Sequence, residues 1–316
     1  MIVAAGLTPA WQQIVELNRL EVGEVNRAKR VAWCASGKVL NVGLALHELG
    51  ATAVTVSPAG GLTGQAMQAE FASHGAVCRW IAADAPTRVC TTLLAPDVKT
   101  GGLLAAQSLD ATEIVENAAA LTSTELTAFI AMFAEAAAEA SLVVLTGSLP
   151  AGTPTTFYRD LLAEIRCPAL LDIRGEELSH ALPMKPFLVK PNRQELSATL
   201  GRPLDDEAAI IAGGRELVSR GATWVLISSG ARGAWLIGER DAWRFRPPAI
   251  TVVNPIGCGD CLAAGTAWGL FQELTVAESV RLGMAAAAHN AELWLPSLLD
   301  PARVHALVEQ VAMERV

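Results

Sequence analysis

The sequence predicts an α/β fold in which helices cover both faces of a mostly parallel central sheet and a small β-sheet projects as a lid. Short apolar, β-branched segments alternate with longer amphipathic ones, a pattern typical of strand–helix units. Two segments rich in strand and turn residues interrupt this alternation without a helix of their own. The 316 residues are 52% hydrophobic, which is enough for a large core and excludes a disordered chain.

The main sheet and its helices follow from the alternation along the chain. Buried strands are expected at Ile2–Gly6, Ala53–Ser57, Leu142–Thr146, Ala169–Ile173, Phe187–Val189, Trp224–Ser228 and Ile250–Val253. Helices are expected at Val42–Leu49, Gln65–Ser73, Glu125–Glu139, Thr155–Ile165 and Glu207–Ser219. Strands separated by helices form parallel sheets, and ligands of such sheets bind at the carboxyl ends of the strands.

The two irregular segments, 12–40 and 88–108, predict the β lid, and residues 1–11, 41–87 and 109–316 then form the core. The candidate lid strands are Ile14–Leu17, Ala28–Trp33, Arg88–Leu94 and Leu103–Gln107. The alternative is that these segments are edge strands of the main sheet.

Composition narrows the classes of partner. The net charge of −8 comes without a basic run, which argues against nucleic acid as a main partner. No apolar stretch reaches eighteen residues without a polar interruption, so no membrane span or membrane partner is expected. The first ten residues lack the basic region of a signal peptide, and a cytoplasmic protein is expected.

The six cysteines show no spacing typical of a disulfide framework. Cys258 and Cys261 form a C-x-x-C pair that could be a redox or zinc half-site, but no second pair or nearby histidine pair completes it. We interpret both as small residues of a glycine-rich turn.

The most informative local feature is Gly257-Cys258-Gly259-Asp260, between the expected strand Ile250–Val253 and a helix of small apolar residues. Small residues let a ligand approach the backbone, and the start of a helix offers unpaired N–H groups to an anion. The carboxylate of Asp260 at this place suits a hydroxyl that must be held and deprotonated beside a phosphoryl group. The alternative is that Asp260 only caps the helix.

Other phosphate-binding motifs do not occur. The chain has no G-x-x-x-x-G-K-[ST] loop, since Ser36-Gly37-Lys38-Val39 does not fit it, and no G-x-G-x-x-G follows an early strand.

Seven further segments, in order along nearly the whole chain, resemble motifs of the PfkB/ribokinase carbohydrate kinases. The turn at 257–260 resembles the G-A-G-D signature of this family, and the motifs together resemble those of the subgroup of 1-phosphofructokinases and tagatose-6-phosphate kinases. The other matching segments are Leu7–Gln12, Gly23–Ala28, Ser36–Val42, Thr87-Arg88, Thr146–Gly152, Lys190–Leu196 and Ser228–Ala234.

The resemblance implies a ribokinase-like three-layer sandwich and ATP-dependent phosphorylation, with Mg²⁺, of a hydroxyl on a sugar or sugar phosphate. It implies that Asp260 is the base and that Gly257, Cys258 and Gly259 form the phosphoryl-transfer turn. The implied substrate-binding residues are Gln12, Gly37, Lys38, Asn41 and Arg88. The implied nucleotide-binding residues are Lys190, Asn192, Ser228, Gly230, Gly233 and Asn290, and Glu195 would hold the metal through water. A homodimer through the lid is expected.

Several of these residues also have purely structural interpretations. Asn192 and Glu195 are three apart and would form a capping box at a helix start. Asn41 would be the N-cap of the helix Val42–Leu49. Lys38 and Arg88 would be solvated surface charges, rather than groups that grip a phosphate.

The departures from the family motifs gather on the sugar side. Gln12 stands where the family has aspartate, Ser36 and Val39 replace glycines, and Thr8 replaces asparagine. Val39 does not readily adopt a positive φ, which predicts a changed loop shape. Two alternative functions stay open: a catalytically weak protein of the same fold that binds a sugar phosphate or nucleotide as a regulator, and a nucleoside kinase.

Overall fold

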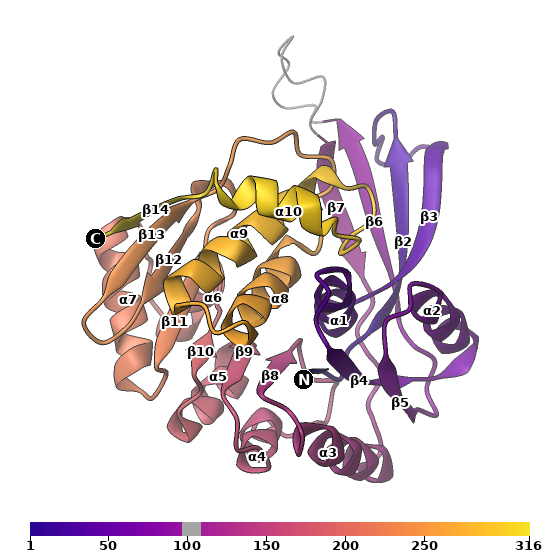
Figure 1. The fold of residues 1–316 in the computed structure, drawn as a ribbon. Helices are drawn as coiled ribbons and strands as arrows, with labels where there is room; N and C mark the ends of the chain where they lie inside the picture. Colours follow the sequence, from indigo (N-terminus) through magenta and orange to yellow (C-terminus); the bar gives the residue numbers. More distant parts are fainter. Residues whose placement is uncertain (97–108) are drawn as a thin grey trace.

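The computed structural model describes residues 1–96 and 109–316, and these residues form a ten-stranded sheet and a separate four-stranded sheet (Figure 1). The large sheet has the order β14-β13-β12-β11-β10-β9-β8-β1-β4-β5. Its strands from β5 to β11 are parallel, and β12, β13 and β14 are antiparallel additions at one edge. This architecture confirms the predicted α/β class.

The expected strands of the core are present, except Ile250–Val253, with small shifts at their ends. The large sheet contains β1 (Ile2–Ala5), β4 (Ala53–Ala59), β5 (Cys78–Ala82), β8 (Leu142–Thr146), β9 (Ala169–Asp172), β10 (Leu188–Val189), β11 (Trp224–Ser228), β12 (Ala234–Ile237), β13 (Ala242–Arg246) and β14 (Ala312–Arg315). Alternate residues of β1 face two different clusters: Val3 and Ala5 lie in one, Ile2 and Ala4 in the other. The sheet is therefore buried on both faces.

Helices cover these two faces and complete the three layers. One cluster is formed with α3 (Ser123–Ala137), α4 (Phe157–Ala163), α5 (Gly175–Ala181), α6 (Arg193–Leu200) and α7 (Glu207–Ser219). The other is formed with α1 (Lys38–Glu48), α8 (Cys258–Phe271), α9 (Val276–Glu292) and α10 (Pro301–Val308). Helix α2 (Gly61–Ser73) packs beside α1, and two 3₁₀ turns, η1 (Leu182–Met184) and η2 (Gly230–Arg232), complete the helical elements of the described residues.

Helix α1 begins four residues earlier than predicted, and this changes the meaning of its residues. Gly37 precedes the helix with a φ of 83°, a left-handed conformation that favours glycine. Asn41 therefore lies inside the helix, so its interpretation as an N-cap is wrong. Val39 is buried in the first turn and is not among the residues with positive φ, so its replacement of a glycine fits this backbone.

The small sheet has the order β3-β2-β6-β7, with β2 (Ala10–Leu17), β3 (Ala28–Ser36), β6 (Val89–Pro96) and β7 (Leu109–Val115). Among the described residues these strands pair only with one another, so they are not edge strands of the main sheet. The placement of 109–115 in the core was wrong, because β7 pairs with β6 along its whole length. The expected strand Leu103–Gln107 lies outside the described residues.

The segment Ile250–Val253 was predicted as a strand and is irregular instead. The reason is that its backbone bonds to the end of a helix: the N–H groups of Val253 and Asn254 donate to the carbonyl oxygen of Ala291, at 2.7 and 3.2 Å. The sheet edge beyond β11 is occupied by the antiparallel strands β12 to β14 instead. Within residues 1–96 and 109–316, no helix has the length and apolar character needed to cross a bilayer.

Candidate active site

A cavity of about 520 Å³ lies where the carboxyl ends of the central strands meet the inner face of the small sheet. Open α/β sheets bind ligands at this edge. Strands of the small sheet and elements of the core line this cavity together, so residues far apart in sequence meet there. Twelve of the sixteen candidate residues line this cavity: Gln12, Gly37, Lys38, Asn41, Arg88, Lys190, Asn192, Glu195, Ser228, Gly257, Gly259 and Asp260.

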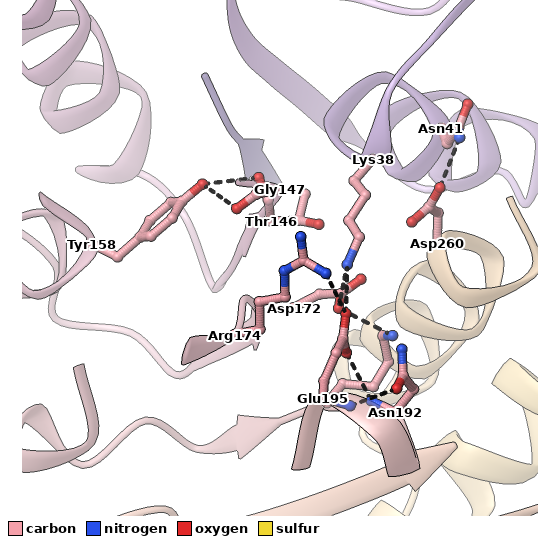
Figure 2. A network of polar contacts seen from close by, with 11 residues as sticks. Lys38, Asn41, Thr146, Gly147, Tyr158, Asp172, Arg174, Asn192, Glu195 and Asp260 are labelled. Atoms are coloured by element: carbon pink, nitrogen blue, oxygen red, sulfur yellow. Dashed lines mark hydrogen bonds and ion pairs between the residues drawn. The ribbon is translucent and has the colours of Figure 1, made fainter. Parts of the chain in front are cut away.

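Asp260 lies in the first turn of α8 and is 7% exposed. Gly257, with a φ of 81°, precedes the helix and caps it without a side-chain hydrogen bond, so the N-cap interpretation of Asp260 is wrong. Asn41 Nδ2 donates to Asp260 Oδ2 at 2.7 Å and fixes the carboxylate in the cavity wall (Figure 2). Gly257, Gly259 and Asp260 all line the cavity, so the start of α8 and this carboxylate face the same space.

The environment of Asp260 raises the pKa of its carboxyl to about 6. Burial is the largest cause, and the negative charge of Asp172 adds to it, while Lys38, Asn41 and Lys190 act in the opposite direction. A carboxylate with a pKa near 6 is a better proton acceptor than an ordinary aspartate and still ionises at neutral pH. A carboxyl group with such a pKa is suited to proton transfer near neutral pH.

Asp172, at the carboxyl end of β9, is a central residue of the site that the motifs missed. Its Oδ1 accepts from Lys38 Nζ at 3.1 Å (Figure 2). The same oxygen lies 3.2 Å from Lys190 Nζ. Burial alone would raise the pKa of Asp172, but the two ammonium groups hold it below its usual range. Its position at the end of a buried strand, where such sheets bind ligands, was the signal that could have identified it.

Lys38 is therefore not a solvated surface charge. Burial favours the neutral amine, but Asp172, Asp260 and Glu195 outweigh it and raise the pKa of the Lys38 ammonium. Its Nζ lies between Asp172 and Glu195, 4.0 Å from Glu195 Oε1. The cavity thus holds two fixed cations, Lys38 and Lys190, beside the turn at 257–260, an arrangement suited to phosphate oxygens.

Asn192 and Glu195 form a capping box at the start of α6, one of the two interpretations that the sequence allowed. Asn192 Oδ1 accepts from the Glu195 N–H at 2.8 Å, and Glu195 Oε2 accepts from the Asn192 N–H at 2.9 Å. The box uses Oε2 alone. The second oxygen, Oε1, lies 4.0 Å from both Lys38 and Arg174, in the wall of the cavity. The structural and the ligand-binding interpretation of Glu195 are therefore compatible.

The end of the cavity under the lid is formed by the inner face of the small sheet. Gln12 is buried, and its Nε2 donates to Thr92 Oγ1 at 2.7 Å. Arg88 donates from three nitrogens to the carbonyl oxygens of Thr8, Pro9 and Glu116, which fixes its guanidinium beside the cavity. A buried amide and an oriented guanidinium are groups that recognise hydroxyls and anions.

Four candidate residues do not line the cavity: Cys258, Gly230, Gly233 and Asn290. Asn290 is fully buried and ties loops together, because its Nδ2 donates to the Ile256 carbonyl oxygen and its Oδ1 accepts from the Ser297 N–H. Asn290 therefore holds the loops around the turn and does not itself face the cavity. Gly233 is required by packing, since a Cβ there would lie 1.9 Å from the Phe245 carbonyl oxygen. Gly230 is exposed in η2.

A helix start that offers N–H groups, a buried carboxylate with a raised pKa and fixed ammonium groups define a phosphotransferase whose acceptor is a hydroxyl. The pfkB family carbohydrate kinase model matches residues 4–292, and the chain belongs to this family.

Relatives and solved structures agree with this assignment. The chain is 32% identical over 285 residues to the 1-phosphofructokinase of Xanthomonas campestris pv. campestris, covering 87% of this chain and 86% of the relative. It is 28% identical to the 1-phosphofructokinase of Escherichia coli, covering 98% and 96%. The structure of Escherichia coli phosphofructokinase-2 in complex with fructose-6-phosphate superposes with a TM-score of 0.84 at 25% identity, covering 98% of both chains.

Proposed function

We propose that the protein transfers the γ-phosphoryl group of ATP to a hydroxyl of a sugar phosphate, as its relatives named 1-phosphofructokinase suggest. The observation that carries this proposal is the buried Asp260 carboxylate, held by Asn41 at the start of α8, in one cavity with Lys38 and Lys190. A protein that only binds a ligand has no need of a proton acceptor beside an anion site, which disfavours a purely regulatory role.

In the proposed reaction, Asp260 accepts the proton of the acceptor hydroxyl as its oxygen bonds to the γ-phosphorus. The bond from phosphorus to the bridging oxygen breaks, and ADP leaves with that electron pair. The N–H groups of Gly257, Gly259 and Asp260 and the ammonium groups of Lys38 and Lys190 stabilise the charge that spreads over the phosphoryl oxygens. Because such transition states are loose, positioning and electrostatics contribute more than the strength of the base.

ATP is expected to lie along the loops at 228–233 and 254–260, where Ser228 lines the cavity and Gly230 is exposed. Mg²⁺ fits the acidic wall of the same cavity. Asp172 Oδ2 is buried without a hydrogen-bond partner, and Glu195 Oε1 is not used by the capping box. These two carboxylates would hold the ion, directly or through water. Bound there, Mg²⁺ would neutralise charge on the phosphate oxygens.

The acceptor is expected under the four-stranded lid, with its phosphate near Lys38 and Arg88 and its hydroxyls near Gln12 and Asn41. The six cysteines are free thiols, which is typical of a reducing compartment and supports a cytoplasmic enzyme.

Acceptor identity is tested by measuring ADP release with ATP and Mg²⁺ over fructose 1-phosphate, fructose 6-phosphate, tagatose 6-phosphate and the free sugars. We expect turnover with a sugar phosphate and a KM for it below that for its free sugar. The Gln12→Asp variant should raise the KM of that acceptor about tenfold, since the shorter side chain loses the buried bond to Thr92, with the KM for ATP unchanged.

The outcomes of this panel separate the candidate functions. Saturable binding of a sugar phosphate without turnover would support the regulatory alternative. Turnover with nucleosides alone would identify a nucleoside kinase. A Gln12→Asp variant with an altered KM for ATP and an unchanged KM for the acceptor would contradict the placement of the acceptor under the lid.

We also propose a homodimer through the outer face of the lid. Trp11 and Trp33 stack there with ring centroids 5.6 Å apart, and Trp33 is 40% exposed with Val31 and Ile114 also exposed. Apolar patches of this kind mark interfaces. A phosphofructokinase-2 from Escherichia coli forms tetramers in its inhibited form, which shows that a structural neighbour assembles.

Trp33→Glu should convert the dimer into a monomer, because it places a charge in the centre of this apolar face. Sedimentation velocity measures the mass directly. Leu62→Glu, at an exposed leucine of α2, is the matched control and should leave the mass of the assembly unchanged. A Trp33→Glu variant that stays dimeric would place the interface elsewhere.

A further inference from the structure

The segment 294–297, which follows α9, lies between the lid and the anion-binding turn and contacts both. On the lid side, the guanidinium carbon of Arg30 lies 3.7 Å from the centroid of the Trp294 ring. Buried side chains of the inner lid face, Ile14, Cys34 and Leu94, pack against Trp294 and Leu295. In this structure the lid therefore packs directly against this segment.

On the other side, the same segment holds the turn that carries the anion site. Asn254 is 1% exposed, and its Nδ2 donates to the Trp294 carbonyl oxygen at 2.9 Å. Its Oδ1 accepts from the Ile256 N–H at 3.0 Å, inside the turn. Pro296 packs against Gly257 so closely that a Cβ on this glycine would lie 2.9 Å from the Pro296 Cβ. The shape of the turn therefore depends on where the segment lies.

We infer that Trp294 and Asn254 are positioning residues that couple closure of the lid to the geometry of the phosphoryl-transfer turn. When the lid is down, Arg30 and the inner face of the lid hold the Trp294 side chain. The Trp294 carbonyl oxygen then accepts a hydrogen bond from Asn254 Nδ2, while Asn254 Oδ1 accepts one from the Ile256 N–H. When the lid lifts, Trp294 loses its partners on that side, and the turn loses one of its anchors.

This coupling gives the acceptor a part in assembling the turn, because an acceptor bound under the lid favours the closed position. Phosphoryl transfer to the acceptor is then favoured over transfer to water, which enters when the lid is open. The inference rests on the proposed role of residues 257–260 in phosphoryl transfer. It adds that the position of the lid controls the geometry of this turn through Trp294 and Asn254, which do not touch the reacting atoms.

A double-mutant cycle on kcat tests the coupling. Arg30→Met removes the cation from the Trp294 ring at an exposed position and should lower kcat about threefold. Asn254→Ala removes both hydrogen bonds of the amide and should lower kcat by about tenfold or more. Because Arg30 acts on kcat through Asn254, adding Arg30→Met to Asn254→Ala should lower kcat no further, whereas the KM for the acceptor should still rise.

Lys29→Met is the matched control, since Lys29 lies next to Arg30 on β3 but pairs with Glu16 within the lid. It should leave kcat unchanged in both backgrounds. An Arg30→Met variant that leaves kcat unchanged, or that lowers it by the same factor with and without Asn254, overturns the inference.

Hydrogen–deuterium exchange separates failure of this inference from failure of the proposed function, because it requires no turnover. Arg30→Met and Trp294→Leu should speed exchange of the peptide that contains Ile256, whose N–H is protected by Asn254. Lys29→Met should not. If the wild type shows no kinase turnover, the proposed function fails, and exchange alone decides the coupling. Unchanged exchange at 253–259 in both variants overturns the coupling whatever the activity.

Discussion

Replacing Asp260 by asparagine is expected to lower kcat by about 10²- to 10⁴-fold, the usual contribution of a general base, while the fold is kept. Asparagine has nearly the same shape, and its side-chain oxygen can still accept from Asn41. It cannot take up the proton of the acceptor hydroxyl. Steady-state ADP release at saturating ATP and acceptor measures this loss.

The matched control is Asp205→Asn, at a carboxylate whose side chain is 86% exposed, and it should leave kcat unchanged. Thermal unfolding checks that Asp260→Asn is folded. Near-normal turnover of Asp260→Asn would exclude Asp260 as the base and leave it only an orienting role.

The pH profile should carry the signature of the same residue. A base must be ionised, and burial raises the pKa of Asp260 to about 6, so kcat/KM of the wild type should fall as the pH drops through 6. The unfolded-state pKa is 3.8, so ionised Asp260 destabilises the folded state above pH 6, and this cost fades as the pH falls from 6 to 4. Asp260→Asn should therefore stabilise the protein at pH 7 rather than at pH 4.

The second large effect is on stability. Asp172→Ala is expected to lower the free energy of unfolding by about 3–5 kcal/mol, the usual result of leaving a buried charge without its partner. Asp172 is 1% exposed and Lys190 is 3% exposed, so the ammonium group of Lys190 would lose its buried counterion. Urea denaturation at pH 7 measures the change.

The double variant Asp172→Ala with Lys190→Met removes both charges and should recover most of the lost stability, although neither variant is expected to keep full activity. The sign of the pH dependence gives a second check. The folded-state pKa of Asp172 lies below its usual value, so its stabilisation is present above pH 4 and is lost as the pH falls through the folded-state value. A double variant as unstable as the single one would show that the loss is due to the cavity and not to the charge.

The sequence predicted the sheet well because its strands are buried on both faces, so Leu142–Thr146 and Trp224–Ser228 are continuous apolar runs with the observed bounds. The same kind of apolar, β-branched pattern gave a wrong strand prediction at Ile250–Val253. The backbone of this segment bonds to the end of α9 instead of to another strand. A local pattern cannot show which partner is nearer in space. The helix start at Lys38 was missed because it depends on the positive φ of Gly37, which is a property of the folded backbone.

The site residues also divide into those that the sequence could predict and those that it could not. Gly257, Gly259 and Asp260 were predicted to share one site because they are nearly adjacent in sequence, and all three line the cavity. Asp172 was missed because it belongs to no such motif, and only the sheet brings it to Lys38 and Lys190. The family resemblance placed Asn290 near the nucleotide, whereas in the structure it is fully buried in α9 and does not line the cavity.

The hydrogen bond from Asn41 to Asp260 joins residues 219 positions apart in the chain. A contact of such sequence separation forms late, because the entropy of closing so long a loop is lost before the contact can compensate for it. During synthesis, the hydrogen bond between Asn41 and Asp260 cannot form until the turn at 257–260 has left the ribosome. Phosphoryl transfer is therefore a property of the finished chain, and its return during refolding reports the last steps of assembly rather than the early collapse of the core.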